Sequence, residues 1–470
     1  MPVLPVTLIK GDSHGSEVDY RDNLPVNMYA VNREILGAQG YMIEYPGLTS
    51  FGTGSGIDRG GLYNERLSNH YRISGTKLIS VSSTGVVVEL GDISGTKQAA
   101  MPYSFTTQAI IVDGKMWLYE SVGGLVEVVD GDLGDPIDGV WVDGYYFLTD
   151  GEYIYHTDIT DETAIDPLKF ATAEFMPDES LGLLKTSDNK VAVFGRYTIE
   201  YFADVAQANF AFTRIESRAQ KIGIVATHAK CELGGNFYIT GGQKEEGIGV
   251  HKITAGSAQK ISTREIDKIL SQYTEAELAD MRMETRFEND IIFILIHLPN
   301  EVLCFNDTIA KAFGLAYGWS ILKSYNQGDI AYRGINGLFD PRAAKWICGD
   351  KQGTYLGVID DSVATQYDTQ VEWILYTPFV YLETASIDEV EIFTIPGFSN
   401  SVETVAISLT YNGVTFGTEY WLDYSEIGSY NTSFIVRRLG YVSDWVGFKF
   451  RGVSTARMTF GLMKVTYSYS

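Results

Sequence analysis

Strand signals separated by Asp-Gly turns dominate the middle of this sequence. Residues 140–142 lead into Asp143-Gly144, residues 145–148 follow, and Asp150-Gly151 then separates them from residues 153–155. Asp-Gly between β-forming residues is a strong short-range hairpin signal, because both turn positions must tolerate positive φ. The run therefore predicts a meander of short antiparallel strands.

Similar strand–turn–strand units recur around residues 190–202, 236–252, 290–305 and 345–359. Their spacing is on the order of the 40–50 residues that one propeller blade takes. Radial repetition of small sheets also removes long exposed edge strands from a sheet-rich chain. We therefore expect an all-β fold, with a β-propeller of six or seven blades over residues 62–365.

The regions on either side of these units have a different pattern. Residues 1–61 are punctuated by Pro and Gly, and we expect an irregular N-terminal segment packed on the body. Residues 366–470 contain several alternating strands and turns such as Asn412-Gly413, without a helical pattern. This pattern predicts a separate C-terminal β-sandwich.

Residues 264–283 break the β pattern with apolar side chains at helical spacing. Thr274 and Glu277 fit a capping box, which marks the start of a second short helix. Neighbouring acidic residues favour a packing role over DNA binding. We expect a small helical insertion that projects from the β core and buries four side chains: Ile266, Ile269, Leu270 and Leu278.

Charge and hydropathy narrow the functional classes. The net charge of −24 repels phosphate, so we do not expect nucleic acid to bind along a broad face. The longest apolar run, residues 291–298, is too short to cross a bilayer and reads as a buried strand. No signal peptide is expected at the N-terminus. The widely spaced Cys231, Cys304 and Cys348 are expected to be buried thiols of a reducing compartment.

No motif in the sequence predicts catalysis, and we expect no catalytic residue, no cofactor site and no metal site. The Gly-rich run at residues 52–60 lacks the spacing of a phosphate-binding loop, and Ser55 is not in a nucleophile elbow. The histidines are scattered singly and lack metal-ligand spacing. They are His14, His70, His156, His228, His251 and His297.

Two acidic groups leave alternatives open. Asp130, Asp132, Asp135 and Asp138 lie among glycines, but the third ligand of an EF-hand is displaced and its closing Glu is missing. We expect a solvated turn cluster there, with a calcium loop as the alternative. The second group could imitate a glycosidase pair, although such pairs arise by chance in an acidic chain. Its members are Asp158, Asp161, Glu162 and Asp166.

Several short stretches, in the same order along nearly the whole chain, carry a family resemblance. They are Leu24-Pro25-Val26-Asn27-Met28, Glu34-Ile35-Leu36, Gly40-Tyr41, Pro46-Gly47, Arg59-Gly60, residues 198–202, 266–280, 296–299, Cys348-Gly349-Asp350, Thr377-Pro378-Phe379, and residues 437–440 and 446–449. With these residues the chain resembles the packaged-DNA-stabilisation proteins, or tail hubs, of short-tailed, lambdoid-type bacteriophages. The stretch at 266–280 is the most specific of them.

This resemblance implies a structural, non-enzymatic virion protein without catalytic residues. Such proteins form a ring of six copies beneath the portal and its adaptor ring. They extend the exit channel, help to retain packaged DNA, and support the tail needle and tailspikes. Genomic DNA would pass through without sequence-specific binding, no membrane segment is implied, and the chain would occur in the virion tail and, during assembly, in the host cytoplasm.

Two other classes compete with this interpretation. A glycan-binding or glycan-cleaving propeller of a phage tail would need exposed aromatics and paired carboxylates at one mouth of the propeller. A host sensor-like propeller would normally carry a signal peptide and a more regular repeat, neither of which we identify in this sequence.

Overall fold

A computed structural model gives the fold of the chain. The structure describes residues 3–7, 23–34, 37–173, 175–207, 209–254, 256–326, 330–394, 402–424 and 433–469.

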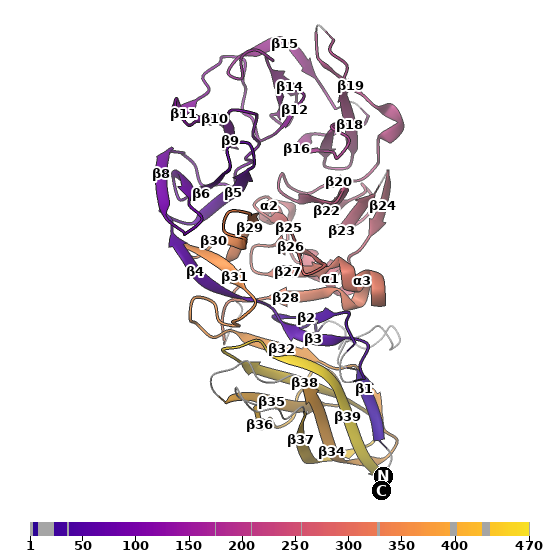
Figure 1. The fold of residues 1–470 in the computed structure, drawn as a ribbon. Coiled ribbons are helices and arrows are strands. Elements are labelled where there is room, and N and C mark those ends of the chain that lie inside the picture. Colours follow the sequence, from indigo (N-terminus) through magenta and orange to yellow (C-terminus); the bar gives the residue numbers. More distant parts are fainter. Residues whose placement is uncertain are drawn as a thin grey trace.

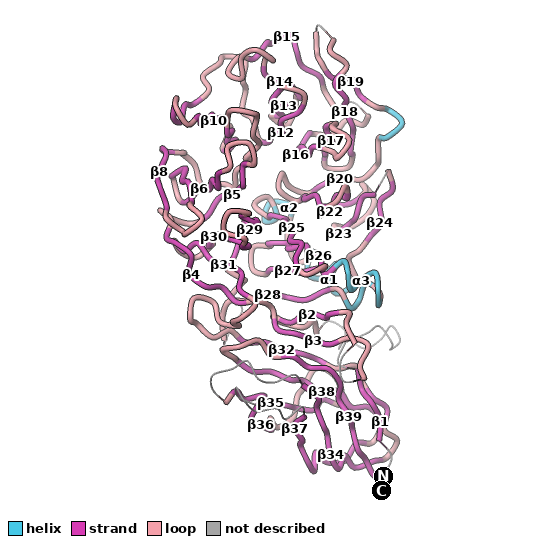
Figure 2. Tube along the Cα trace, in the orientation of Figure 1, coloured by secondary structure: helices cyan, strands magenta, loops and turns pink. Residues whose placement is uncertain are grey.

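Of the residues that the structure describes, 54% are in strands and 6% in helices, which confirms the all-β prediction (Figure 2). In the described ranges, seven sheets of three to five strands form a ring, and two sheets of five and six strands pack together beside it (Figure 1). The ring is a β-propeller and the packed pair is a β-sandwich, as the sequence predicts. The propeller has seven blades, within the expected six or seven.

The blades follow one another along the chain as antiparallel meanders. The first four contain β5 (Asp58–Asn64), β6 (Asn69–Ser74), β7 (Lys77–Val81) and β8 (Val87–Asp92); β9 (Gln108–Val112), β10 (Lys115–Glu120) and β11 (Gly124–Glu127); β12 (Asp138–Val142), β13 (Tyr145–Thr149), β14 (Ile154–Thr157) and β15 (Ile165–Ala171); and β16 (Ser180–Lys185), β17 (Val191–Gly195), β18 (Ile199–Asp204) and β19 (Phe212–Arg214). The second blade has three strands, and Ala100 and Tyr103 make isolated bridges to β9.

The last three blades complete the ring. They contain β20 (Gly223–Ile224), β21 (Lys230–Leu233), β22 (Asn236–Gly242), β23 (Gly249–Thr254) and β24 (Ser257–Lys260); β25 (Arg282–Glu288), β26 (Ile291–His297), β27 (Val302–Asn306) and β28 (Trp319–Leu322); and β29 (Gly334–Asp340), β30 (Lys345–Asp350), β31 (Tyr355–Asp360) and the N-terminal strand β4 (Gly47–Thr53). Because β4 pairs antiparallel with β31, hydrogen bonds between the beginning and end of the propeller close the ring.

The sandwich also combines N-terminal and C-terminal strands. One sheet contains β1 (Val3–Thr7), β2 (Met28–Val31), β3 (Tyr41–Glu44), β34 (Ala385–Thr394), β37 (Ser433–Val442) and β39 (Thr459–Tyr469); the other contains β32 (Glu372–Tyr376), β33 (Val380–Tyr381), β35 (Glu403–Thr410), β36 (Tyr420–Tyr424) and β38 (Trp445–Val453). Their facing side chains, including Trp373, Phe448 and Phe450, form one apolar core.

The expectation of an irregular segment at residues 1–61 is therefore wrong in part, since β1 to β5 all begin within it. The Gly-rich run was misleading because its glycines lie where backbones approach closely inside and beside strands. A Cβ on Gly52 would lie 2.4 Å from the carbonyl oxygen of Gly85, and one on Gly54 would lie 2.3 Å from Ser74 Oγ. Glycine permits these approaches rather than marking a loop.

The predicted helical segment contains α1 (Arg264–Leu270) and α2 (Glu275–Leu278), before β25 begins at Arg282. Thr274 and Glu277 form the expected capping box. Ile266, Leu270 and Leu278 are fully buried, while Ile269 is partly buried. These apolar side chains belong to a core shared with blades four to six, so the pair packs into the propeller more closely than a projecting insertion would.

A third helix that was not predicted, α3 (Asp307–Phe313), lies between β27 and β28. The Asn306 side chain caps it by accepting a hydrogen bond from the backbone N–H of Ile309. Two short 3₁₀ turns complete the helical structure in the described ranges: η2 (Glu216–Arg218) and η3 (Leu315–Tyr317).

Candidate functional site

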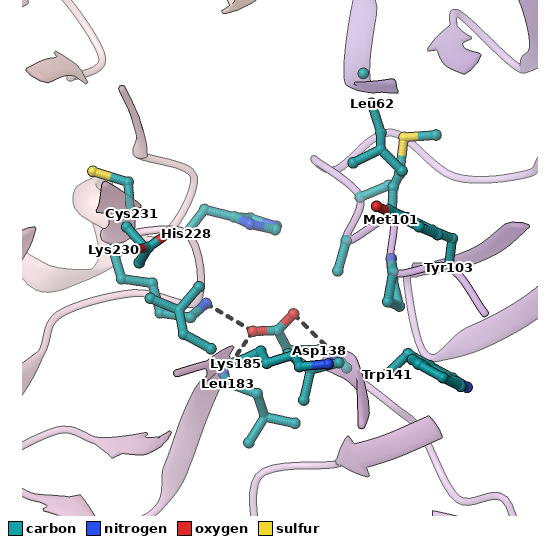
Figure 3. Close-up of a pocket in the computed structure, with 18 of the residues that line it drawn as sticks. Leu62, Met101, Tyr103, Asp138, Trp141, Leu183, Lys185, His228, Lys230 and Cys231 are labelled. Carbon is teal, nitrogen blue, oxygen red and sulfur yellow. Dashed lines mark hydrogen bonds and ion pairs between the residues drawn. The ribbon is translucent and has the colours of Figure 1, made fainter. Parts of the chain in front are cut away.

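A cavity of about 600 Å³ opens where the first strands of several blades converge on the propeller axis (Figure 3). Its walls come from β5, β12, β16, β21 and β25 and from residues 99–105 of the second blade. A second cavity of about 490 Å³ shares Arg282 with the first. Concave cavities are the usual places where proteins bind small molecules, so the residues that line these two form the candidate site.

A buried ion pair lies on the wall of the larger cavity. Lys230 Nζ is 2.7 Å from Asp138 Oδ2, and both side chains are about 5% exposed. Asp138 also accepts hydrogen bonds from the backbone N–H groups of Leu183 and Gly139, at 2.7 and 2.9 Å (Figure 3). The pair thus joins β12, β16 and β21. A carboxylate with this many donors is tied to its blades rather than available for proton transfer.

A larger charged network joins the first and last blades. Arg72 Nε donates to Asp58 Oδ2 at 2.7 Å, and its Nη2 donates to the carbonyl oxygens of Ile335 and Asn336. Asn336 Nδ2 donates to the other oxygen of Asp58 at 2.7 Å. Burial raises the pKa of Asp58, and the Arg72 charge opposes that shift. This network joins the first blade of the propeller to the last blade.

His70 lies beside this network, fully buried. Its Nδ1 is 3.4 Å from Asp340 Oδ2, and its Nε2 is 3.2 Å from a guanidinium nitrogen of Arg72. Burial lowers the pKa of His70 to about 4, although Asp340 favours the protonated form. The imidazole is therefore neutral at physiological pH and acts as a packed polar group.

A third group borders the smaller cavity. His297 Nε2 is 3.1 Å from Glu284 Oε1, and Lys351 Nζ is 3.2 Å from His297 Nδ1. Burial lowers the pKa of Lys351 to about 8. His228 contacts Arg282 at 3.3 Å on one ring nitrogen and the carbonyl oxygen of Gln98 at 3.2 Å on the other. These charged groups contact one another across blades, which suits rigid joining better than catalysis.

The Asp-rich turn does not gather its carboxylates at one point. Asp130 accepts hydrogen bonds from the backbone N–H groups of Asp132 and Ile165, whereas Asp138 turns to Lys230 on the propeller axis. Within the described ranges, no group of three or more His, Cys, Asp or Glu side chains could hold a metal ion.

The second acidic group forms turn contacts between β14 and β15. Asp158 accepts from Thr160, Asp161 accepts from Thr163, and Lys169 lies 3.7 and 3.6 Å from Asp158 and Asp166. Glu162 instead accepts from Thr107 Oγ1 at 2.6 Å. Each carboxylate has a local structural partner, and none of these four lines either axial cavity.

The remaining single residues are also distributed through the fold. Cys231, Cys304 and Cys348 are buried free thiols, as predicted, and burial raises the pKa of each. His156 lies among aromatic rings, and its Nε2 accepts from the backbone N–H of Ala211. His251 is buried in β23, and His14 lies outside the described residues.

The axial networks have no motif in the sequence, because each member is an isolated charged residue. Asp58, Asp138 and Arg282 each begin the first strand of a blade, and only the ring brings those positions together. The one feature of the sequence that could have revealed them is a charged residue at the start of the first predicted strand of a blade. No helix in the described part of the chain is long and apolar enough to span a membrane.

Comparison with known proteins identifies both modules. The family model described as "Bacteriophage P22 Gp10, beta-propeller" matches residues 4–364, and the model described as "Bacteriophage P22 Gp10, beta-sandwich" matches residues 372–468. The curated protein "Tail hub protein gp10" of Salmonella phage P22 is 30% identical over 480 aligned residues, covering 98% of each chain.

Solved structures resemble the chain only distantly. A streptogramin B lyase structure matches with a TM-score of 0.43 and 10% identity, covering 66% of this chain and 96% of that chain. The extracellular domain of a putative one component system from B. thetaiotaomicron matches with a TM-score of 0.44 and 9% identity, covering 77% and 46%. These similarities carry no functional argument. The family models and the curated relative do, and this chain belongs to the P22 Gp10 family of phage tail hub proteins.

Proposed function

We propose that this chain is the structural tail hub of a short-tailed phage. In this role it extends the portal channel, helps to retain packaged DNA, and supports the tail needle and tailspikes as a ring of six copies. The observation that carries the proposal is the N-terminal segment, whose strands are built into both the propeller and the sandwich. A connector that bears pressure needs this kind of rigid link between its modules.

Two hydrogen bonds show how directly the segment joins the modules. The backbone N–H of Val26 donates to Ile374 of the sandwich at 2.9 Å, and the N–H of Asn27 donates to Ile321 of the propeller at 2.8 Å. Domains joined only by a linker move relative to one another by default. Consecutive peptide groups bonded to both modules oppose that motion.

Arg457 adds a clamp at the same junction. Its Nε donates to the Glu44 carbonyl at 2.7 Å, and its terminal nitrogens reach Tyr29 Oη at 2.8 Å and Asp361 Oδ1 at 2.6 Å. These partners belong to β3, β2 and the loop that follows β31 of the last blade. One side chain therefore connects the sandwich, the N-terminal strands and the propeller.

The charge of the chain agrees with a channel protein. A net charge of −24 repels DNA phosphates, so DNA can slide past without sticking. The same charge makes free copies repel one another. A preassembled portal–adaptor surface would hold neighbouring copies close together and raise their effective concentration, so weak lateral contacts suffice there.

Glycan binding is the second candidate, and one observation favours it. Phe105 is 58% exposed at the larger axial cavity, and its ring lies 4.8 Å from the ring of Trp141 and 4.8 Å from the Arg66 guanidinium. Exposed aromatics can stack on sugar rings. The acidic group considered for glycan cleavage, Asp158 to Asp166, does not line this cavity. Asp138 and Glu284, which do line it, are paired with Lys230 and His297, so binding is favoured over cleavage.

The test is sedimentation of the purified chain across salt concentrations, with and without portal–adaptor particles. We expect a monomer at low salt and a six-fold ring on the particles. Higher ionic strength should favour self-association, because charge repulsion is screened over about 8–10 Å at physiological salt. A stable hexamer at low salt without particles would reject the assembly mechanism. Failure to bind the particles would reject the function.

A further inference from the structure

The end of the sandwich farthest from the propeller gathers exposed aromatic side chains. Ala385 at the start of β34 pairs with both Val442 at the end of β37 and Tyr469 at the end of β39, while Tyr381 pairs with Trp445. These pairs place the two sheet ends together, beside the C-terminus in Figure 1. We call this region the distal tip: residues 381–384, 441–445 and Tyr469.

The apolar side chains of the distal tip are largely open to solvent. Their exposed fractions are 49% for Tyr381, 52% for Tyr441, 45% for Trp445 and 67% for Tyr469. None of them belongs to the apolar core of the sandwich. Single exposed apolar residues need no explanation, but a contiguous group marks an interaction surface.

Two contacts order aromatic side chains in and beside the tip. The rings of Tyr381 and Trp445 have centroids 5.0 Å apart. Tyr411 Oη donates a hydrogen bond to the Tyr441 carbonyl oxygen at 3.3 Å, which joins the 411–419 loop to the end of β37. Tyr and Trp are the residue types that most often dominate binding energy at protein interfaces.

Acidic side chains at the tip favour a partner with basic side chains. Glu383 and Asp444 are exposed in the same turns, and in the described part of the chain neither carboxylate forms an ion pair with a basic side chain. A second copy would bring the same acids and a net charge of −24 against them. A partner with Lys or Arg would pair with the carboxylates and place cations over aromatic rings.

We infer that the distal tip docks a segment of another tail protein that carries Lys or Arg beside apolar side chains. The inference rests on the proposed function, because the partner is sought in the same tail. It assigns the sandwich end to partner binding, while the junction with the propeller provides rigidity.

The test places a photo-crosslinking benzoylphenylalanine at Tyr441 of the full chain, in assembled virions. Irradiation should link it to one other tail protein, within a segment rich in Lys or Arg, as mapped by mass spectrometry. Links only to other copies of this chain, or no link in tails that contain the chain, would overturn the inference alone. Absence of the unsubstituted chain from purified tails would overturn the proposed function, and the inference with it.

A variant series separates docking from folding. The double variant Tyr381→Ser with Tyr441→Ser should lower incorporation of the chain into tails at least about tenfold. Truncating a single hot-spot residue of an interface can weaken binding more than tenfold. Glu383→Lys with Asp444→Lys should lower incorporation as well, through charge reversal. Tyr325→Ser is the matched control, because Tyr325 is 44% exposed but lies outside the tip.

All variants should melt within a few degrees of the unsubstituted chain. Equal incorporation of the tip variants and the Tyr325→Ser control would overturn the inference. Soluble host polysaccharide should bind the unsubstituted chain and the tip variants equally, if at all. Loss of polysaccharide binding in the tip variants would assign the tip to glycan and overturn the protein partner.

Discussion

The propeller axis and the sandwich core bury different chemistry. Around the axis, Asp58, Arg72, His70 and Asp340 contact one another across blades, whereas the facing sheets of the sandwich enclose an apolar core. Strand starts from every blade converge on an axis, where backbone groups and charges must find partners from neighbouring blades. Sheet faces meet over whole side chains and can be sealed by apolar packing.

One carboxyl group in the sandwich, that of Glu44, should have the largest effect on the free energy of unfolding. Glu44 is fully buried, and its Oε2 accepts from Ser454 Oγ at 2.6 Å and from the Met458 N–H at 3.2 Å. Burial raises the pKa of Glu44 from 4.5 to about 8. The unfolded chain therefore releases this proton near pH 4.5, while the folded chain keeps it until about pH 8.

Stability from this group should fall as pH rises from about 4.5 to 8, by at most about 5 kcal/mol. Chemical denaturation at several pH values should show the loss in the unsubstituted chain and a flatter profile in Glu44→Gln. Parallel profiles for the two proteins would mean that Glu44 is not buried as described.

The next effect concerns the axis. Arg72→Met leaves the Asp58 carboxylate buried without its cation, and we expect a loss of about 3–5 kcal/mol in the free energy of unfolding. The double variant Arg72→Met with Asp58→Leu should lose less than the single variant, because it removes both charges. A double variant at least as unstable as the single one would show that the pair does not act as a unit.

His70 should lower the stability of the fold as pH falls, which is the opposite of the pH dependence expected from Glu44. Its pKa is lowered to about 4, so below pH 6.5 the unfolded chain takes up a proton that the folded chain refuses. Stability should fall by about 3 kcal/mol as pH drops from 6.5 to 4. His70→Gln should flatten this acid limb, whereas Glu44→Gln should leave it intact. An acid limb unchanged by His70→Gln would contradict the assignment.

The smallest effect should occur at the distal tip. Tyr441 is about half exposed, so Tyr441→Ser should change the free energy of unfolding by less than about 0.5 kcal/mol. Thermal and chemical denaturation can measure this directly. A loss above about 2 kcal/mol would mean that the tip aromatics stabilise the fold rather than serve a partner.

Local turn chemistry made much of this fold predictable. Asp143 and Gly144 have positive φ between β12 and β13, as their hairpin motif requires. The capping box at Thr274 likewise marked α2. Signals of this kind depend on neighbouring residues only, so they survive without knowledge of the tertiary structure.

Long-range pairing was not predictable in the same way. The pairing of β4 with β31 joins residues about 300 positions apart, and no local signal marks it. The same five residues, Ile-Ser-Gly-Thr-Lys, also occur at 73–77 and 93–97 in different structural settings, because the first copy includes the turn between β6 and β7 while the second follows β8. The axial networks form only when the ring closes. In the sequence, their histidines and acids therefore appear as single, unrelated residues.

The central claim is that this chain is the hub of a phage tail, and imaging of the intact tail tests it most directly. Electron cryomicroscopy of purified virions should reveal six copies of the seven-bladed propeller and its sandwich in a ring below the portal–adaptor complex. The junction of the two modules should match the geometry set by Val26, Asn27 and Arg457. A tail whose density at that position excludes this fold, or in which the chain is absent by mass spectrometry, would contradict the account.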